Sequence, residues 1–240
     1  MDATIADIIE DFSTFRVAVI VATGMVVADD RSPVLDDWAA MAEADIRDRY
    51  AGTPLSEIPG IRDWRAAYRA FGIKKTSYRC SVERLVKNAL AGRPLPRINA
   101  FVDAYNAVSL KHVLPAGADD LDRVAGDIAF RYARPGDSFI RLGDEAGTEA
   151  PPKTGEVVYA DSEKVLCRRW NWSQDARSPV SSATTRAIVT VQSLGAVALD
   201  GAVEDLTALL AETCGADIAV TMLDAATATK AVVASGRAND

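Results

Sequence analysis

The hydrophobic period of this chain changes at about its midpoint, and the change restricts the folds that it can adopt. Between residues 32 and 108, apolar side chains recur every three or four positions, as on helices with one buried face. From Asp127 onward, most apolar runs are short and β-branched, as in strands. A chain of 240 residues can bury one sizeable core. We therefore predict a single α+β domain with its helices concentrated in the first half.

No repeat, low-complexity tract or clear linker divides the sequence. Residues 1–61 are expected to add a strand and a helix to the domain, residues 62–226 to form its main part, and the polar tail 227–240 to fray. No apolar run is long enough to span a bilayer, and no basic region precedes an apolar one at the N-terminus. We therefore expect a cytoplasmic protein without membrane contact.

Helix-start signals locate the expected helices. Ser32 is a candidate N-cap with Pro33 at the first helical position, and Asn99 is a second candidate N-cap. Either Ser77 or Ser81 is expected to cap the helix that precedes Asn99. The apolar faces of the expected helices cover 35–46, 61–71, 82–90, 101–108 and 203–214.

The expected strands are apolar runs bounded by turn residues. The run 15–22 is apolar almost throughout and is typical of a strand buried on both faces. Residues 157–166 are expected to form a β-hairpin or two adjacent strands around the turn 161–164. The remaining strands are expected at 128–133, 139–142, 187–193 and 218–223.

A cluster of unusual composition follows that hairpin. It consists of Arg168, Arg169, Trp170, Asn171 and Trp172. Such side chains stack on flat groups and hydrogen-bond to anionic ones, so the cluster indicates a binding surface. The same residues are equally compatible with tryptophans that fill a core and arginines that face solvent.

The charge of the chain is unevenly distributed. The net charge is −7, but residues 62–97 hold ten Lys and Arg against Asp63 and Glu83, a local charge of +8, which leaves −15 for the rest. A basic segment on an acidic body is compatible with docking a phosphate backbone and also with ordinary helix-surface charges. The candidate nucleic-acid contacts in this segment are Lys74, Lys75, Arg79, Arg84 and Lys87.

The cysteines and the single histidine exclude several kinds of site. Cys80, Cys167 and Cys214 are odd in number and widely spaced, which argues against a disulfide framework and against zinc. We expect reduced thiols, no metal and no cofactor. His112 is the only histidine, so the usual Ser-His and Cys-His catalytic pairs are absent unless this residue supplies them.

Four separated motifs resemble the freestanding members of the B3/B4 domain family. They are residues 95–110 (Leu-Pro-Arg-Ile-Asn-Ala-Phe-Val-Asp-Ala-Tyr-Asn-Ala-Val-Ser-Leu), 119–124 (Asp-Asp-Leu-Asp-Arg-Val), 155–161 (Gly-Glu-Val-Val-Tyr-Ala-Asp) and 167–172 (Cys-Arg-Arg-Trp-Asn-Trp). The resemblance covers roughly residues 62–193. It implies helices around a mixed, β-sandwich-like core. That domain is also the editing module in the β subunit of bacterial phenylalanyl-tRNA synthetase, where it hydrolyses tyrosine wrongly esterified to tRNA for phenylalanine.

The chain departs from the synthetase pattern at two places. The synthetase places a histidine shortly after the helix that begins at Asn99, whereas this chain has Leu-Pro-Ala-Gly at 114–117 and His112 a few residues early. The glycine-rich turn of the synthetase is replaced by residues 168–172, which are expected to fill or reshape the pocket. Neither the amino acid recognised nor the retention of hydrolysis therefore follows from the resemblance.

The resemblance implies trans-editing, the hydrolysis of the ester bond of mischarged aminoacyl-tRNA. An aminoacyl ester is already activated, so a water molecule oriented by an amide and the ribose hydroxyl can suffice, which suits a chain with one histidine. Asn99 and Asn171 are the candidates to hold that water or the carbonyl group. Asp161 is the candidate partner for the substrate's α-ammonium group, and Asp103 and Asn106 lie on the helix that borders the pocket in the synthetase.

The remaining candidates would contact the RNA end. Arg168 or Arg169 could hold its terminal phosphates, and Trp170 and Trp172 could stack on adenine or on the amino-acid side chain. The expected partners are thus aminoacylated tRNA and an amino-acid moiety. The alternative function is a module that binds RNA or an amino acid without catalysis.

Several candidates also have a purely structural interpretation. Asn99 can simply cap its helix, Asp161 can stabilise the hairpin turn, and Asp103 can bind backbone groups or Arg97. His112 is expected to be a surface residue or to be satisfied by a neighbour.

Overall fold

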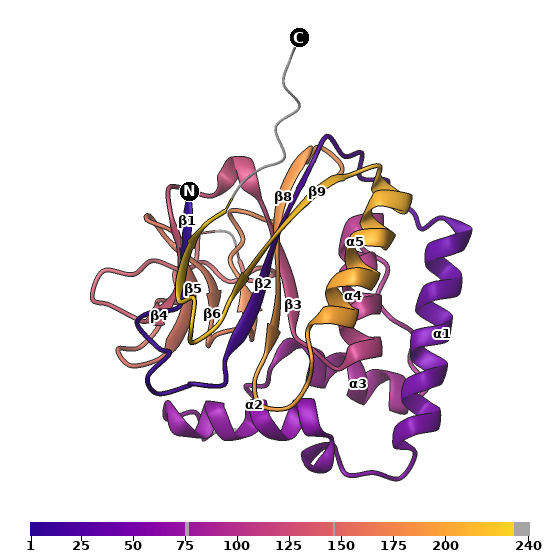
Figure 1. Ribbon diagram of the computed structural model, residues 1–240, viewed down its shortest axis with the longest axis horizontal. Coiled ribbons are helices and arrows are strands. Elements are labelled where there is room, and N and C mark those ends of the chain that lie inside the picture. The colour runs from indigo at the N-terminus through magenta and orange to yellow at the C-terminus, as the bar shows by residue number, and fades with distance from the viewer. Residues whose placement is uncertain (75–76, 146, 233–240) are drawn as a thin grey trace.

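Two β-sheets packed face to face and a layer of helices form the protein (Figure 1). The computed structural model describes residues 1–74, 77–145 and 147–232. Within these ranges one sheet is four-stranded in the order β3-β8-β2-β9. Its strands are β2 (Arg16–Thr23), β3 (Ala116–Asp120), β8 (Arg186–Ser193) and β9 (Asp217–Leu223), all paired antiparallel.

The second sheet is six-stranded over the same ranges, in the order β10-β1-β4-β5-β6-β7. Its strands are β1 (Asp2–Thr4), β4 (Ile128–Tyr132), β5 (Val157–Ala160), β6 (Val165–Arg168), β7 (Ser173–Gln174) and β10 (Thr229–Ala231). It is mixed, because β1 pairs parallel with β4 whereas the other pairs are antiparallel. The predicted α+β fold with a sandwich-like core is confirmed.

Strand β2 lies between the two halves of the hydrophobic core. Val17, Val19 and Val21 belong to the apolar cluster between the sheets, whereas Ala18 and Ile20 belong to the cluster under the helices. Successive side chains of a strand point to opposite faces, so a strand covered on both faces must be apolar throughout. This explains the continuous apolar run that predicted the strand.

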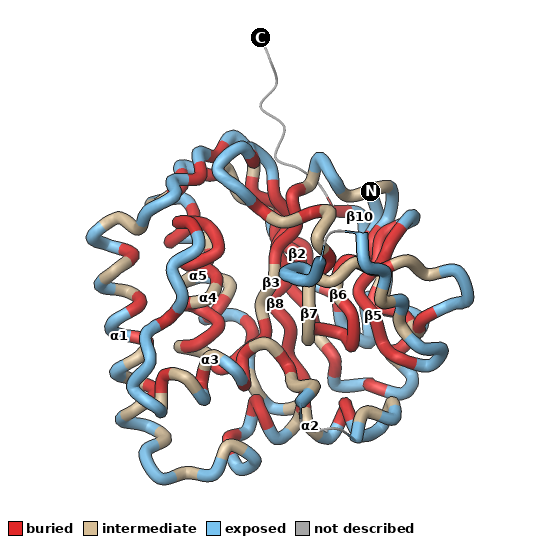
Figure 2. The backbone as a smooth tube through the Cα atoms, turned by 180° about the vertical axis from the view of Figure 1, so that it is seen from behind, coloured by how far each residue is buried: buried red, intermediate tan, exposed pale blue. Residues whose placement is uncertain are grey.

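The helices cover the outer face of the four-stranded sheet and one end of the molecule (Figure 1). They are α1 (Pro33–Tyr50), α2 (Pro59–Ala70), α3 (Ser81–Leu90), α4 (Ala100–His112) and α5 (Asp200–Cys214), with short 3-10 turns at Leu55–Glu57 and Leu121–Arg123. Helix α2 runs across the end of the sheets and buries Trp64 and Tyr68 in the core between them. Figure 2 shows that buried residues follow the strands, α4 and α5, whereas much of α1 is exposed.

The expected helix caps are partly confirmed. The Ser32 hydroxyl accepts a hydrogen bond from the Leu35 amide, and the Asn99 side chain accepts one from the Val102 amide. The expected cap of α3 was wrong. Cys80 holds the N-cap position without a side-chain bond, Ser81 is the first helical residue, and its amide donates to the backbone oxygen of Asn171.

Three segments differ from the expected strands. Residues 139–142 form isolated bridges instead of a strand, because the Ile140 amide bonds to the buried Asp175 carboxylate. Residues 116–120, for which no strand was expected, form β3 at the edge of the sheet. Within the tail expected to fray, 227–240, the segment Thr229–Ala231 pairs with β1 at the other end of the chain. No helix within the described ranges is both long and apolar enough to cross a membrane.

Candidate functional site

A cavity of about 160 Å³ opens between the two sheets, where the edge strand β3 meets β6 and β7. We call it the inter-sheet pocket. The strand ends that border it lie close together in Figure 2. It is lined by Ser81, Tyr105, Asn106, Ala116, Gly117, Ala118, Asp119, Tyr159, Leu166, Cys167, Asn171, Trp172, Ser173, Gln174, Thr190 and Gln192.

A chain of hydrogen bonds fixes one wall of the pocket. The Tyr68 hydroxyl donates to Oδ1 of Asn171 at 3.0 Å, and Nδ2 of Asn171 donates to Oε1 of Gln192 at 3.0 Å. Nε2 of Gln192 then donates to the Thr190 hydroxyl at 3.1 Å. Each bond fixes which end of the next amide is the donor. The second N–H of Asn171, the second N–H of Gln192 and the Thr190 hydroxyl proton are therefore the donors that this wall can offer to a ligand.

Two further hydroxyls in the pocket have no protein partner. Tyr159 is 3% exposed, and its hydroxyl is buried without a hydrogen bond to any described residue. The hydroxyl of Ser81 is in the same state. Burial is the main reason that the pKa of Tyr159 is raised well above its usual value, so the hydroxyl stays protonated. An unsatisfied buried hydroxyl is costly and rare in native proteins, and a ligand or ordered water is its usual explanation.

Asp119 supplies the carboxyl group of the pocket. It is 4% exposed, and both the Ser178 hydroxyl (2.7 Å) and Nε2 of Gln174 (3.1 Å) donate to its Oδ1. Burial raises its pKa to about 7, against these two hydrogen bonds, which lower it. The carboxyl therefore changes charge near neutral pH, and a cationic group in the pocket would favour its ionised form.

The other reactive side chains do not supply a nucleophile. Burial raises the pKa of the Cys167 thiol far above its usual range, so the sulfur that lines the pocket is a neutral thiol. His112 lies outside the pocket, where its Nε2 is 2.6 Å from the Asp205 carboxylate. Within the described ranges no group of three or more His, Cys, Asp or Glu is placed to hold a metal.

The structure brings only some of the predicted residues to the pocket. Asn171, Trp172 and Asn106 line it. Asn99 lies elsewhere: besides capping α4, it donates from Nδ2 to the Val180 carbonyl. Asp103 accepts a 2.6 Å hydrogen bond from Nε of Arg31 and another from the Ile98 amide. It therefore binds a backbone group, one of the two structural partners expected for it, whereas Arg97 pairs with Asp36.

Trp170 fills the core rather than the pocket. Its ring is 0% exposed and packs edge-on against Phe12, Phe15 and Trp64 at centroid distances of 4.8–5.0 Å. Trp172, two positions later, is partly exposed and lines the pocket. Each of the two interpretations therefore holds for one tryptophan: Trp170 fills a core, and Trp172 faces a cavity.

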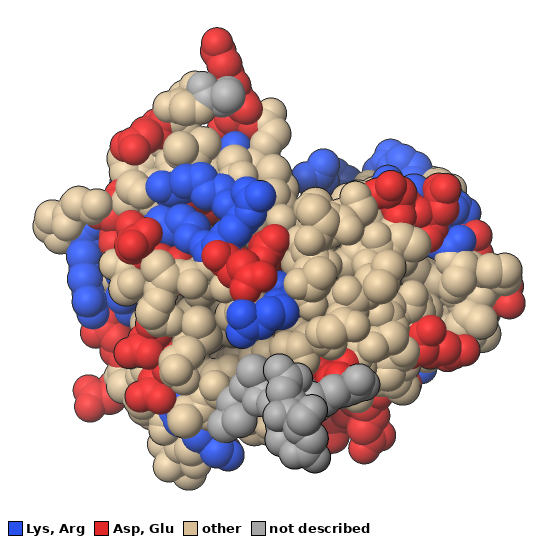
Figure 3. All heavy atoms as spheres, turned by 90° about the horizontal axis from the view of Figure 1, so that it is seen from above, with Lys and Arg blue, Asp and Glu red and all other residues tan. Residues whose placement is uncertain are grey.

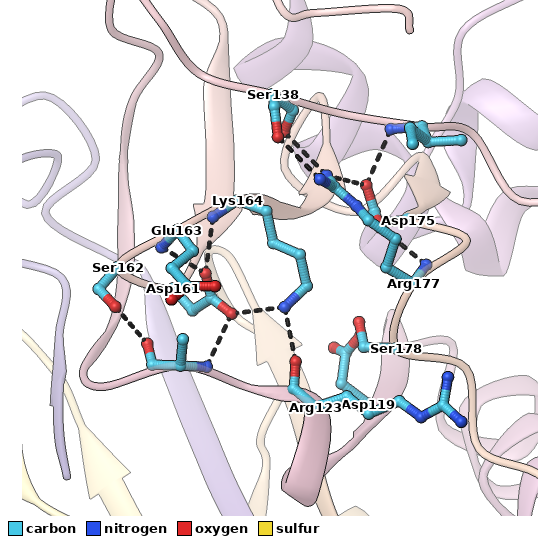
Figure 4. Close-up of polar contacts among 12 residues, drawn as sticks. Asp119, Arg123, Ser138, Asp161, Ser162, Glu163, Lys164, Asp175, Arg177 and Ser178 are labelled. Carbon is cyan, nitrogen blue, oxygen red and sulfur yellow. Dashed lines mark hydrogen bonds and ion pairs between the residues drawn. The ribbon is translucent and has the colours of Figure 1, made fainter. Parts of the chain in front are cut away.

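Asp161 stabilises the hairpin turn. Its carboxylate accepts hydrogen bonds from the amides of Ala125, Glu163 and Lys164 and is 2.8 Å from the Lys164 ammonium (Figure 4). Burial alone would raise the pKa of Asp161, but these four donors hold it below the usual value. These donors engage both carboxylate oxygens of Asp161, and Asp161 is not among the residues that line the inter-sheet pocket.

The basic segment is only partly available to a nucleic acid. Lys74, Arg84 and Lys87 are exposed, whereas Arg79 is paired with the buried Glu83 at 3.0 Å. Lys75 lies outside the described residues. The face opposite α2, seen from above in Figure 3, carries basic and acidic side chains intermixed. Of the five candidate contacts, only Lys74, Arg84 and Lys87 are exposed among the described residues.

The sequence did not identify five of the residues that give the pocket its polarity: Ser81, Asp119, Tyr159, Thr190 and Gln192. One signal was present. Ile188, Thr190 and Gln192 share a face of β8 by the two-residue period of a strand, so that face changes from apolar to polar along its length. Two neighbouring polar residues on a buried strand face indicate a cavity or a polar network.

The sequence and the fold have known relatives. The B3/4 domain matches residues 63–215. The phenylalanine–tRNA ligase beta subunit of Fusobacterium nucleatum is 33% identical over 81 residues, which are 34% of this chain and 10% of that protein. The corresponding subunit of Bordetella pertussis is 30% identical over 94 residues, 39% of this chain and 12% of that protein. The chain thus spans only a small part of the curated relatives that it matches.

A solved structure is also similar in part. It is an N-terminal fragment of the phenylalanyl-tRNA synthetase beta-subunit from Pyrococcus horikoshii, with a TM-score of 0.41 and 17% identity. The similarity covers 49% of this chain and 40% of that one.

Proposed function

Because this chain belongs to the B3/4 domain family, we propose that it hydrolyses the ester bond of mischarged aminoacyl-tRNA, with the aminoacyl group bound in the inter-sheet pocket. The observation that carries the proposal is the pair of buried hydroxyls, Tyr159 and Ser81, that have no hydrogen-bond partner among the described residues, in a pocket lined by amides and one carboxyl group. A ligand with several polar atoms in a small volume satisfies such a set.

The pocket offers a partner for each polar part of an aminoacyl ester. Asp119 faces the α-ammonium group, a role that the sequence had suggested for Asp161. The second N–H of Asn171 donates to the carbonyl oxygen, where negative charge develops as the ester is attacked. The hydroxyls of Tyr159 and Ser81 hold the attacking water.

The reaction needs no nucleophilic side chain. Water adds its oxygen to the ester carbonyl carbon, the bond from that carbon to the ribose oxygen breaks, and the proton lost by the water ends on the ribose oxygen. Amino acid and uncharged tRNA are released. Fixed donors around a bound ester supply the catalysis by orientation and by stabilising the oxyanion. This agrees with the neutral state of the Cys167 thiol.

The test is a deacylation assay on a panel of mischarged tRNAs, with release of the free amino acid as the readout. We expect turnover on at least one mischarged tRNA and a strong decrease in the Tyr159→Phe variant. Correctly charged tRNAs serve as substrate controls, and protein-free incubation measures spontaneous hydrolysis. Release at the spontaneous rate with every tRNA of the panel would exclude the hydrolytic function.

The second candidate is a module that binds RNA or an amino acid without hydrolysing it. The lining residues favour it in one respect, since they include no histidine and no ionised thiol. Equilibrium binding of aminoacylated tRNA without amino-acid release identifies this function. Binding that is insensitive to salt would indicate an amino-acid ligand instead of RNA.

A further inference from the structure

Arg169 is a buried cation without a hydrogen-bond acceptor. It is 5% exposed, its Nε and Nη1 atoms are buried without partners, and no hydrogen bond joins its guanidinium to any described residue. Its neighbour Arg168 binds both carboxylate oxygens of Glu156 at 2.9 and 3.0 Å. Glu156 comes no closer to Arg169 than 3.7 Å, at Nη2. The one nearby carboxylate is therefore already engaged.

The surroundings hold the Arg169 guanidinium in place. Its central carbon lies 3.6 Å from the ring centroid of Tyr78 and 4.3 Å from that of Trp172, and the two rings meet edge to face. Arg169 and Trp170 both have positive φ angles, 49° and 65°, which side-chain-bearing residues adopt at a cost. The buried ring of Trp170 anchors this strained turn in the core, so the turn presents Arg169 in a fixed orientation.

The guanidinium borders a surface hollow of about 490 Å³ with an excess of positive charge. Lys74, Lys153, Arg168 and Arg169 line it, and Glu156 is its acidic residue. Both lysines are exposed, and neither forms an ion pair with a described residue. Because Arg168 neutralises Glu156, the charges of Arg169 and the two lysines remain for a ligand.

We propose that this hollow binds a phosphate group, with Arg169 as its main hydrogen-bond donor and Lys74 and Lys153 as supporting charges. A planar guanidinium with free N–H groups matches the oxygens of a phosphate, and an anion relieves the cost of the uncompensated buried charge. The site is distinct from the inter-sheet pocket but adjoins it, because Trp172 lines that pocket and also packs on Arg169.

The source of the phosphate is inferred to be a phosphodiester near the 3′ end of a bound RNA. This part rests on the proposed function: an aminoacyl group in the inter-sheet pocket places its own RNA backbone on the far side of Trp172, next to the hollow. Free phosphate or a mononucleotide has the same chemistry. The experiment must therefore separate these ligands.

The experiment is calorimetric titration of the full chain at constant ionic strength with three probes: inorganic phosphate, 5′-AMP and a short single-stranded RNA. Arg169→Gln is expected to lower the affinity for all three by about tenfold or more, because it removes a charge-assisted hydrogen bond. Lys153→Gln, at an exposed position, is expected to lower it by about threefold. Arg186→Gln removes an equal charge from the exposed start of β8, about 20 Å along that strand from Gln192 and the 168–172 turn, and should leave the affinity within about twofold.

The folded state is checked by near-UV circular dichroism and by the melting temperature in phosphate-free buffer. If Arg169 has only a structural role, Arg169→Gln lowers the melting temperature. The affinities of Arg169→Gln and Lys153→Gln for phosphate then equal that of the unchanged chain. That result overturns the proposal. An RNA that binds no more tightly than 5′-AMP overturns the assignment to a phosphodiester.

These outcomes are independent of hydrolysis. If no mischarged tRNA is deacylated but Arg169→Gln abolishes phosphate binding, the proposed function fails and the phosphate site stands. If deacylation occurs but the unchanged chain binds no phosphate, the phosphate site fails alone.

Discussion

The Tyr68 hydroxyl donates a 3.0 Å hydrogen bond to Oδ1 of Asn171 and thereby ties helix α2 to the turn between β6 and β7. The same proton is shared with the Arg169 carbonyl, whose oxygen lies 2.7 Å from the hydroxyl. Tyr159 is equally buried, yet its hydroxyl has no partner among the described residues. The two tyrosines thus form a natural comparison between a hydroxyl used by the fold and one available to a ligand.

Replacing each tyrosine with phenylalanine should separate stability from activity. Tyr68→Phe removes a hydroxyl with two partners and is expected to cost about 1–2 kcal/mol of unfolding free energy. Tyr159→Phe removes an unsatisfied hydroxyl, so stability should be unchanged or slightly higher, whereas deacylation should fall about tenfold or more. Urea unfolding and the deacylation assay measure both quantities. A Tyr159→Phe variant that is less stable but fully active contradicts the assignment.

Asn171→Ala is expected to reduce both stability and activity. The change leaves the Tyr68 hydroxyl and Oε1 of Gln192 with fewer partners, which costs about 1–3 kcal/mol. Loss of an oxyanion donor should lower the turnover number by about 10²-fold. Asn99→Ala is the matched control, since it removes a helix cap outside the pocket and should cost about 1 kcal/mol with turnover retained.

Stability should fall as the pH rises through the titration of Asp119. The folded chain keeps this carboxyl protonated up to about pH 7, whereas the unfolded chain loses the proton near its usual value of 3.8. Between these limits the folded state binds the extra proton, so its stability decreases with rising pH and then levels off. Melting temperatures of Asp119→Asn should decline less than those of the unchanged chain from pH 4 to 7.

Deacylation should respond to pH in the opposite direction. The α-ammonium group of the substrate needs ionised Asp119, so the rate at low substrate concentration should rise through pH 7 and fall again where that ammonium group loses its own proton, at about pH 8. Rates corrected for spontaneous ester hydrolysis test this. In Asp119→Asn the corrected profile should be low and flat, and an unchanged profile would remove Asp119 from the mechanism.

The two tryptophans should differ in their contribution to stability. Trp170→Ala removes a ring that is packed on all sides and is expected to cost about 3–5 kcal/mol. Trp172→Ala removes a partly exposed ring and should cost about 1 kcal/mol. Urea unfolding monitored by circular dichroism measures both variants. Equal costs would mean that Trp172 is also a core residue.

RNA binding through α3 should depend on salt. Arg84 and Lys87 are exposed on that helix, so Arg84→Glu and Lys87→Glu should weaken binding of a short RNA and reduce its salt slope by about one each. Arg186→Glu makes the same change of charge at the exposed start of β8 and should have little effect. Equal weakening by all three variants would indicate a general charge effect instead of a binding face.

The sequence predicted the part of the candidate site that is local. The segment 168–172 was recognised from its composition, and Asn171, Trp172 and Asn106 do line the inter-sheet pocket. The sequence could not decide whether Asp161 and Asn99 bind a ligand, because an aspartate also suits a turn and an asparagine also suits a helix cap. Their backbone partners satisfy them in the fold. Asp119 lay within a recognised motif, but its raised pKa depends on burial that only packing creates.

The sequence by itself determined the elements. The apolar run of β2, the helical spacing of 32–108 and the caps at Ser32 and Asn99 depend on a few neighbouring residues, whose steric and hydrogen-bonding preferences act within one or two turns. Tertiary structure decided which side chains meet. Residues 116–120 form strand β3 because they pair with β8 at the edge of the four-stranded sheet. Close packing of the two sheets brings Asp119, Tyr159 and Asn171 to one cavity. Burial, which depends on contacts between distant segments, then left the Tyr159 hydroxyl and the Nε and Nη1 atoms of Arg169 without hydrogen-bond partners among the described residues.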